Sequence, residues 1–545
     1  MTTHWTAPLH SRGFYLTILL AVSIVFAVRS YQVFGPDSVY VQPFNSDSAL
    51  PVLMANDNTI DLFRAYIYGQ DQIGAWPFLF GQLIHKSTGY NWTPNSIYLI
   101  QVVWLSLSIL LVASLSRPYG ALAGLIVAVV LTLNPAVSHY FFVLNQRNAW
   151  QCSSFFLGWF LIRHISDRLW SDIKASMISL SIIALAGSAF LAVWSSSLNG
   201  PFLIAIAVLE LMRIKILQHS RKILSLPKLA GIFGPVVTAI VSEAILKACY
   251  HRHSLKHFGT EFKTPMQIDW EKFGVNLSNQ WHLFTQQPWW ALTLFGVSAS
   301  VAASVYLLLM TRNKSEPSND SEAKVNLLVI VSGCGVVAWG SFLVTVLFTW
   351  VRLNAYGPRY LAQTEMFGSL AGLITLVLLI RIFAGSFAER SKVIAITSCA
   401  VALLLALKFP LVQRRAEYAE LQNVTKGLIE KGSPIVVLGG YWDTYSLAAL
   451  AAPGQIVPVP AEDQLQRTPW TVDQMREANQ VVVVHHEFLR QPAVETPVPY
   501  ETFGDGQNPP SSITQYGMDL QLLKPKWYEL NGYRFSLYRN GFRDK

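Results

Sequence analysis

The sequence is short of charge. Asp, Glu, Lys and Arg together make up 13% of its 545 residues, whereas hydrophobic residues make up 52%. Soluble globular proteins carry about 25% charged residues, so about half of the usual charge is missing. An ordinary soluble fold is therefore excluded for most of the chain, and a polytopic α-helical membrane protein is predicted.

Cysteine pairs and nucleotide motifs are missing too. Of the four Cys residues, Cys152, Cys334 and Cys399 fall inside apolar runs and Cys249 ends one, with no CxxC spacing. They read as small apolar side chains and indicate neither disulfides nor a zinc framework. The chain also lacks Walker A, G-x-S-x-G and H-E-x-x-H motifs, and no GxGxxG follows a strand. Energy from nucleotide hydrolysis is therefore not expected.

The net charge of +9 comes without a basic block or tail. Lys and Arg are scattered over short segments between apolar runs, so no nucleic-acid partner is expected. The basic residues suit membrane topology and contact with anionic lipid head groups instead.

Long apolar runs dominate what is present. A spanning helix needs about 20 mostly apolar residues. About eleven segments meet that requirement: 14–34, 97–115, 119–137, 150–166, 176–194, 201–217, 229–248, 289–310, 325–349, 366–384 and 393–411.

Lys and Arg gather in every second connection between these runs, beginning with Arg12 before the first. Positive residues in short loops stay on the cytoplasmic side. The N-terminus is therefore expected in the cytoplasm, with loop 35–96, the segments 250–289 and 352–365, and all residues after the last run outside. The long connections thus share the outer side, where we expect the function to lie.

The loop 35–96 has structure of its own. Asp57, Asp61 and Arg64 alternate with apolar residues over 54–67, which predicts a helix lying on the membrane surface. Tyr68–Pro77 reads as a polar, Gly-containing turn leading to a second interfacial helix. A connection of about 60 residues with its own structure is usually functional.

The composition becomes polar near residue 416. Short apolar strands within 434–440, 455–458 and 480–484 alternate with helices near 444–451 and 471–478, which predicts a small parallel α/β sheet. Lys526–Asn540 reads as a hairpin with a tight turn at Asn531-Gly532. We therefore expect a transmembrane domain over 1–415 and a soluble extracytoplasmic α/β domain over 416–545.

Asp47 is the strongest candidate for a catalytic group. It lies in Phe44–Pro51, directly after the first apolar run and so at the membrane surface. Transfer of a sugar from a lipid phosphate needs a base for the acceptor hydroxyl and cations for the departing phosphate. The alternative is that Asp47, or a neighbouring Ser46 or Ser48, caps a helix starting near Ala49. Asp57 and Asp61 are weaker candidates for supporting acids, because such residues often form only the solvated face of a helix.

Arg352 and Arg359 stand where the ninth run emerges outside, against the positive-inside bias. Because the Arg fork matches phosphate oxygens, they are the expected phosphate-binding pair, with snorkelling to the interface as the alternative. Arg147, in the second outer turn, is a further candidate.

Glu243, Lys247 and His251 follow one another at intervals of four at the outer end of the seventh run. They form either a polar face lining the site or an ion pair stabilising the helix end. His253 and His257 extend the polar segment, but three His at these spacings do not share one helix face. A metal site is therefore the minor alternative.

The arrangement resembles the GT-C superfamily of membrane glycosyltransferases, which includes protein O-mannosyltransferases and the lipid A aminoarabinose transferase. The resemblance covers the topology and an Asp soon after the first span, here in Phe44-Asn-Ser-Asp-Ser48, with Gly69–Pro77 behind it. It implies that Asp47 is the base and that Arg352, Arg359, Lys247 or Arg147 binds the donor phosphate. Many members have a second acid beside the first, where this chain has Ser48.

The resemblance implies an inverting glycosyltransferase that moves a sugar, a hexose or a pentose, from a polyprenyl-phosphate donor to a glycan, lipid or protein acceptor. No cofactor is implied, and a divalent metal is allowed but not required. The expected location is a bacterial inner membrane with the active site outside. Two alternatives stay open at this point: a transporter of lipid-linked glycans, and a non-enzymatic assembly protein of the cell envelope.

Overall fold

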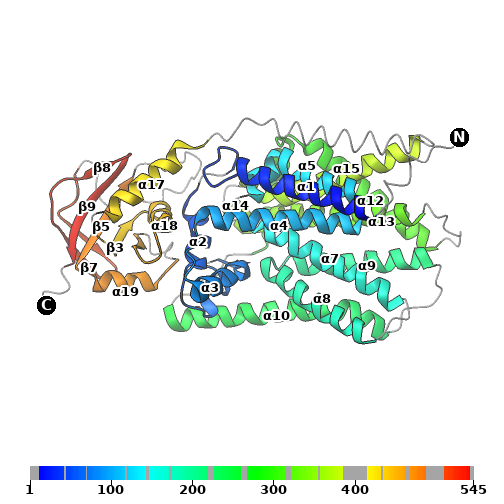
Figure 1. Cartoon of the computed structure of the whole chain (residues 1–545), viewed down its shortest axis with the longest axis horizontal. Coiled ribbons are helices and arrows are strands. Elements are labelled where there is room, and N and C mark those ends of the chain that lie inside the picture. Colours follow the sequence, from blue (N-terminus) through cyan, green and yellow to red (C-terminus); the bar gives the residue numbers. More distant parts are fainter. Residues whose placement is uncertain are drawn as a thin grey trace.

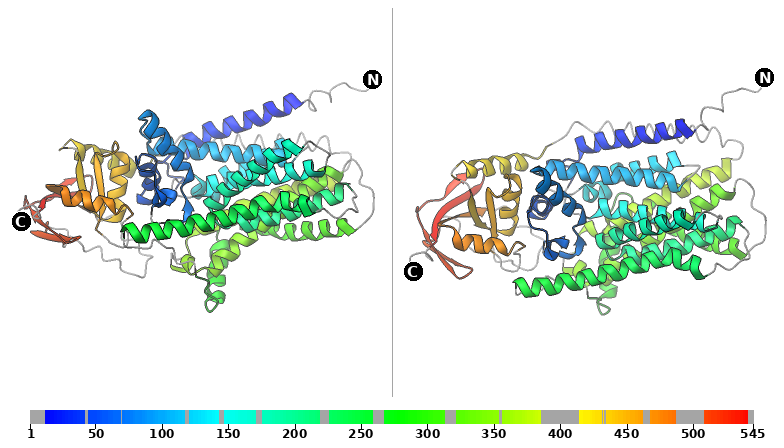
Figure 2. Two further views of the ribbon diagram at one scale, coloured as in Figure 1. Left: turned by 90° about the horizontal axis from the view of Figure 1, so that it is seen from below. Right: turned by 60° about the horizontal axis from the view of Figure 1, so that its bottom comes forward.

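The computed structural model describes residues 12–41, 44–68, 70–116, 120–142, 147–170, 175–218, 226–258, 267–312, 321–353, 356–384, 414–430, 432, 434–461, 467–486 and 508–540. The molecule is elongated, with a bundle of helices at one end and a sheet domain at the other (Figure 1). The helices of loop 35–96 lie between them, in every view (Figures 1 and 2).

Ten of the eleven expected apolar runs coincide with helices. These are α1 (Arg12–Val33), α4 (Pro94–Leu115), α5 (Gly120–Leu133), α7 (Asn148–Trp170), α8 (Ala175–Ser195), α9 (Asn199–Gln218), α10 (Leu226–Phe258), α12 (Trp290–Arg312), α13 (Ser321–Leu347) and α15 (Ala362–Ala384). The eleventh run, 393–411, falls outside the described residues.

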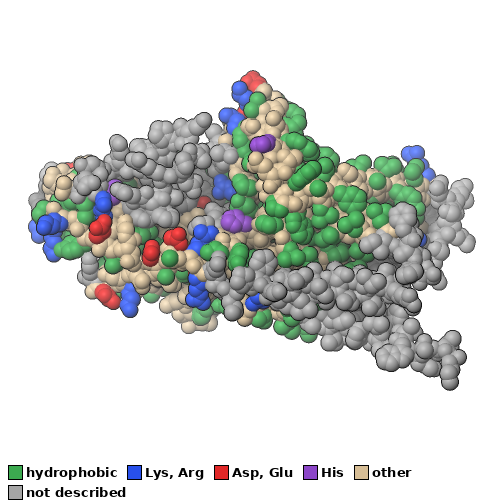
Figure 3. Space-filling view, turned by 90° about the horizontal axis from the view of Figure 1, so that it is seen from above, with side chains coloured by type: hydrophobic (Ala, Val, Ile, Leu, Met, Phe, Trp, Pro, Cys, Tyr) green, Lys and Arg blue, Asp and Glu red, His purple; other side chains and the backbone are tan. Residues whose placement is uncertain are grey.

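Within the described ranges, five helices are long and apolar enough to cross a membrane: α4, α10, α12, α13 and the stretch leading into α15. The pair α5 and α6 (Pro135–Phe141) is a sixth if it counts as one bent span. The surface agrees with this assignment, because apolar side chains cover the helical part in Figure 3 and charged ones are more frequent over the sheet domain. Leu180 and Ile183 on α8, for example, are 70% and 68% exposed.

The run 119–137 is not one straight helix as expected. The chain bends by 83° between α5 and α6. Asn134 caps α6 by accepting hydrogen bonds from the backbone N–H groups of Ala136 and Val137. Pro135 follows at the first helical position, which suits a helix start and interrupts a helix interior. The Asn-Pro pair therefore breaks the span.

The helix expected over 54–67 is wrong. The chain forms α2 (Ser46–Ala55), the 3-10 turn η2 (Leu62–Ala65), a hairpin of β1 (Tyr66–Ile67) and β2 (Gln70–Gly74), and then α3 (Trp76–Thr88). Asp57 and Asp61 accept hydrogen bonds from the backbone N–H groups of Thr59 and Arg64, which favours turns over a continuous helix. Two helices, α2 and α3, do flank a polar turn as expected, but their bounds differ from the expected ones.

The sheet domain has mixed strands. β3 (Ile435–Gly439) pairs in parallel with β4 (Ile456–Pro460) and β5 (Gln480–His486), as the sequence indicates. The antiparallel strands β9 (Tyr533–Asn540), β7 (Met518–Leu522) and β6 (Ser512–Gln515) extend the order to β4-β3-β5-β9-β7-β6. β8 (Tyr528–Leu530) forms the predicted hairpin with β9, and both Asn531 and Gly532 take positive φ, as a type I′ turn requires.

Helices cover both faces of this sheet. α17 (Ala416–Ile429) and α18 (Tyr441–Leu450) share one apolar core with β3, and α19 (Trp470–Glu477) belongs to the core on the opposite face. Phe44 and Leu53 of the outer loop pack against the core of α17 and α18. The sheet domain is therefore seated on α2 by apolar contact.

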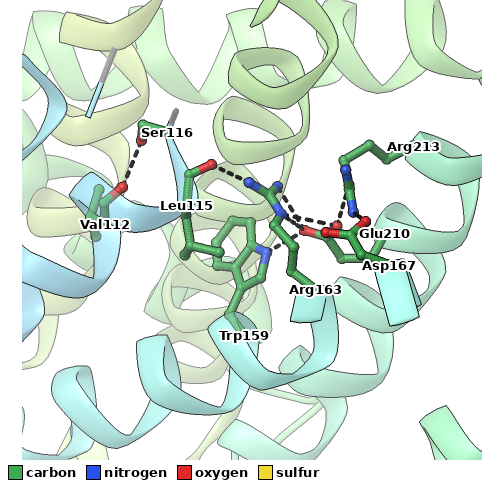
Figure 4. A network of polar contacts seen from close by, with 8 residues as sticks. All are labelled: Val112, Leu115, Ser116, Trp159, Arg163, Asp167, Glu210 and Arg213. Atoms are coloured by element: carbon green, nitrogen blue, oxygen red, sulfur yellow. Dashed lines mark hydrogen bonds and ion pairs between the residues drawn. The ribbon is translucent and has the colours of Figure 1, made fainter. Parts of the chain in front are cut away.

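A buried charge network holds the far end of the bundle. Glu210 on α9 is fully buried and accepts hydrogen bonds from Arg163 at 2.8 and 2.9 Å and from Arg213 at 2.6 Å (Figure 4). Asp167 pairs with Arg213, and Trp159 Nε1 donates to Glu210. Two positive and two negative charges compensate each other. The sequence pattern indicates only that these arginines lie near the cytoplasmic side of the membrane. In the fold they form ion pairs that join α7 to α9.

Candidate functional site

Asp47 lies in the first turn of α2. The helix is capped by Asn45, whose side chain accepts a hydrogen bond from Ser48 N at 3.1 Å. The alternative that Ser46, Asp47 or Ser48 caps the helix is therefore wrong, because the extended backbone needed for a cap falls at Asn45. The carboxylate of Asp47 is left available for contacts beyond its own helix.

One of those contacts comes from the sheet domain. The Tyr441 hydroxyl donates a hydrogen bond to Asp47 Oδ1 at 2.6 Å. Tyr441 is the first residue of α18, directly beyond the carboxyl end of β3. Burial and the neighbouring carboxylate of Asp47 raise the pKa of Tyr441 well above its ordinary value. Its hydroxyl is therefore a hydrogen-bond donor at every physiological pH.

Two arginines reach the same place. Arg359, in the short 3-10 turn η3 (Pro358–Leu361), donates to the Tyr360 hydroxyl at 3.0 Å, and its guanidinium lies 5.0 Å from the Tyr360 ring. Arg359, Arg147 and Asp47 all act electrostatically on that hydroxyl. Burial lowers the pKa of Arg147 to about 10, which leaves it protonated at neutral pH. One carboxylate and two cations thus lie close enough to Tyr360 for their charges to act on its hydroxyl.

Arg352 has another partner. It stands on α14 (Thr349–Leu353), and its Nη2 lies 3.1 Å from Asp269 Oδ2 in an ion pair. The backbone beside this pair is also joined, by a bridge between Ile268 and Phe348. Arg352 therefore fastens the segment before α11 (Phe273–Thr285), whereas Arg359 is the member of the expected pair that lies near Asp47.

Asp57 and Asp61 both pair with Arg64, at 2.8 and 2.5 Å. The Tyr68 hydroxyl donates to Asp57 as well, at 2.5 Å. The Arg64 guanidinium lies 4.3 Å from the ring of Trp470, at the start of α19. These two acids thus serve a contact between the outer loop and the sheet domain, and the single positive charge of Arg64 compensates one of their two negative charges.

The polar face of α10 is turned partly inward. Glu243 is buried and accepts hydrogen bonds from the Tyr66 hydroxyl and from Ser197 Oγ, both at 3.2 Å. Lys247 and His251 follow one and two turns later, both partly exposed. The structure therefore uses Glu243 to join α10 to the outer loop and to the turn before α9.

The ring of His253 lies 4.3 Å from that of His257, near the end of α10. Across the described ranges, no three His, Cys, Asp or Glu side chains are arranged to hold a metal ion.

An apolar groove of about 500 Å³ runs between α3 and the N-terminal half of α4. Its walls include Ile84, Leu99 and Val103, whose side chains are between 43% and 56% exposed. Tyr90 and Trp92 line it as well. Aromatic residues of this kind favour the level of the lipid head groups.

Tyr441 and Tyr360 are the site residues that sequence reasoning missed. The signal for Tyr441 is its place: in open α/β sheets, ligands bind outside the carboxyl ends of parallel strands, where the strand order reverses. β3 is flanked by β4 and β5, so this reversal occurs beside the strand that Tyr441 follows. Tyr360 adjoins the candidate Arg359, but nothing in the sequence separates it from an ordinary interfacial Tyr.

No protein-family model matches the chain, and no curated protein does. Solved structures do match. The crystal structure of ArnT from Cupriavidus metallidurans bound to undecaprenyl phosphate is 12% identical over 97% of this chain and 98% of that one, with a TM-score of 0.53. At this identity the likeness shows the fold. The expected fold, a bundle of apolar helices with a C-terminal sheet domain, is confirmed and is shared with ArnT.

The oligosaccharyltransferase AglB from Archaeoglobus fulgidus, in complex with an inhibitory peptide and a dolichol-phosphate, is also similar. It is 11% identical over 86% of this chain and 69% of that one, with a TM-score of 0.42. The apo form of the oligosaccharyltransferase from the same organism is 12% identical over 87% and 70%, with a TM-score of 0.45.

Proposed function

We propose that this chain is an inverting membrane glycosyltransferase that moves a sugar from a polyprenyl-phosphate donor to an acceptor outside the cytoplasm. The observation that carries the proposal is that Asp47, Arg359 and Arg147 lie close enough to Tyr360 for their charges to act on its hydroxyl. A base beside two cations is what the reaction needs, and the fold shared with ArnT supports the same assignment.

In the reaction, Asp47 accepts the proton of an acceptor hydroxyl. The hydroxyl oxygen then attacks the anomeric carbon of the donor sugar as the bond from that carbon to the phosphate oxygen breaks. The electron pair of the broken bond stays on the phosphate, so the products are the glycoside and polyprenyl phosphate. Arg359 and Arg147 compensate the charge that develops on the phosphate. The scheme requires no metal ion.

The groove between α3 and α4 supports a lipid-linked donor. Its walls are apolar and exposed on the helical part of the molecule, and Trp92 in its lining is hydrogen-bonded to Asn56, the C-cap of the helix α2 that carries Asp47. The structure of similar fold from Cupriavidus metallidurans has undecaprenyl phosphate bound. An isoprenoid chain in this groove would leave its phosphate at the level of the head groups.

We assign the chain to a bacterial inner membrane, with its N-terminus in the cytoplasm. Loop 35–96 and the domain over 416–545 would then face the periplasm. The alternation of basic connections supports this orientation. The buried charge network at the opposite end of the bundle from Asp47 would lie at the cytoplasmic side.

The test compares the intact masses of envelope glycolipids and glycoproteins from cells with the wild type, Asp47→Asn or no protein. We expect one sugar-sized mass to be lost equally in the last two. Asp473→Asn is the matched control, since this acid is on an exposed turn of α19 with only a local Arg476 pair. Its product should equal that of the wild type.

Other results would favour the alternatives. A product that persists in Asp47→Asn but not in the null strain would require a different base. Accumulation of a lipid-linked precursor in the null strain, with normal product formation in a cell-free assay with added donor, would indicate transport of the glycan.

A further inference from the structure

Tyr441 joins two distant parts of the chain. Its hydroxyl reaches Asp47 Oδ1 at 2.6 Å across 394 positions of sequence. The contact brings the first residue of α18 in the sheet domain to the first turn of α2 in the outer loop. The candidate base Asp47 is therefore hydrogen-bonded to the sheet domain, which has no other part in the catalytic scheme.

The Tyr441 side chain is held rigidly. It is 3% exposed, and its ring meets the ring of Tyr445 edge-on at 5.5 Å. The Arg467 guanidinium lies 5.9 Å from the Tyr441 ring. Tyr445 is fixed in turn, because its hydroxyl accepts a hydrogen bond from the backbone N–H of Arg467 at 2.8 Å and bonds to Thr468 Oγ1 at 3.0 Å. The position of the Tyr441 hydroxyl oxygen is thus set by packing.

A fixed donor on one carboxylate oxygen orients the other. A carboxylate has two oxygens and about four acceptor positions, so Oδ2 of Asp47 remains able to take a proton. Proton transfer requires the base within about 2.6–3.2 Å of the acceptor hydroxyl and aligned with it. A free Asp side chain would have to adopt that alignment in each turnover, whereas one held through Oδ1 keeps it.

We propose that Tyr441 is a positioning residue for Asp47, so that the sheet domain completes the catalytic site. The proposal rests on the assignment of Asp47 as the base.

The test uses the full-length protein in a transfer assay, with the donor and acceptor that the mass comparison identifies. Tyr441→Phe removes the hydroxyl and keeps the ring packing. We expect kcat to fall about 10- to 100-fold, the range for loss of a hydrogen bond to a charged group. The KM for each substrate should change little, since the ring packing is kept.

Tyr538→Phe is the matched control. It removes a buried hydroxyl on β9 of the same domain, which donates a hydrogen bond to the Pro510 carbonyl oxygen at 2.8 Å. It should lower the thermal stability of the domain as much as Tyr441→Phe does, or more, and leave kcat in place. An equal loss of kcat in both variants would mean that Tyr441 is merely structural.

The outcomes separate this inference from the proposed function. If Asp47→Asn is inactive while Tyr441→Phe keeps the kcat of the wild type, the positioning role is wrong and the base assignment stands. If Asp47→Asn is fully active, the proposed function itself fails.

Discussion

At the scale of single residues, Arg147 and Arg359 are expected to bind the donor phosphate more strongly than Arg352 does. The first two act on the Tyr360 hydroxyl together with Asp47, whereas the charge of Arg352 is compensated by Asp269. We expect Arg147→Gln and Arg359→Gln to weaken binding of undecaprenyl phosphate about 10- to 100-fold, by loss of charged hydrogen bonds. Arg352→Gln should weaken it about threefold or less.

Binding of labelled undecaprenyl phosphate to the purified protein measures these differences. The binding should also weaken as the pH rises through about 10, because burial lowers the pKa of Arg147 to that value and the deprotonated side chain no longer attracts phosphate. A dominant effect of Arg352→Gln, with Arg147→Gln binding normally, would place the phosphate beside Asp269 instead.

The sequence predicts some of this site and not the rest. Asp47 could be found because its position after the first span is readable from hydrophobicity alone. Pairing of Asp57 and Asp61 with Arg64 was overlooked, although the three lie within eight positions. Tyr441 is different: only the docking of α18 on α2 brings it to Asp47, and no local pattern encodes that docking.

At the scale of elements, close packing of α12 against α15 should depend on glycine. Gly368 and Gly372 stand four apart on α15, a spacing that lets helix backbones approach in membranes. A Cβ added at Gly296 of α12 would lie 2.1 Å from the Gly368 carbonyl oxygen, and one at Gly372 would lie 2.6 Å from the Leu292 oxygen. We expect Gly296→Ala and Gly372→Ala to destabilise the protein by about 1–3 kcal/mol each.

Gly187→Ala on α8 is the control. A Cβ there meets no atom within 4 Å, so the variant should gain up to about 1 kcal/mol from better helix propensity. The midpoint of unfolding in a denaturing detergent titration measures both the expected loss of stability in Gly296→Ala and Gly372→Ala and the expected gain in Gly187→Ala. If Gly296→Ala were as stable as the wild type, α12 and α15 could move apart without a loss of stability. Their close backbone contact would then contribute nothing to the free energy of unfolding.

The helices of the bundle can be predicted from the sequence wherever the length of an apolar run alone decides the structure. The break at Asn134 was not predicted, since the flanking residues are apolar enough to extend the run across it. Residues 54–67 were misassigned because their mixed spacing satisfies a surface helix as well as a buried turn. The turn is stabilised by aromatic side chains, since Phe63 and Tyr66 pack against Tyr250 of α10 and Tyr68 packs against Trp470 of α19. Both partners are far away in sequence.

At the scale of the whole molecule, two parts of different character meet at the candidate site. α2 contributes Asp47 from the membrane side, while α18 covers it from the sheet domain. The aromatic contacts of Phe63 with Phe258 and Trp470 tie the end of α10 into the same junction.

The orientation of the molecule can be tested with a native cysteine. α10 has 33 residues, so it is about 50 Å long, whereas the hydrocarbon core is about 30 Å thick. If its first residues lie at the cytoplasmic surface, the segment carrying Cys249 emerges outside, and Cys249 is exposed while Cys152 and Cys334 are buried. A membrane-impermeant maleimide should then label a Cys399→Ser variant in right-side-out vesicles, and the further change Cys249→Ser should abolish that labelling. Labelling that appears only in inverted vesicles would reverse the orientation and place Asp47 in the cytoplasm, where the proposed acceptor is absent.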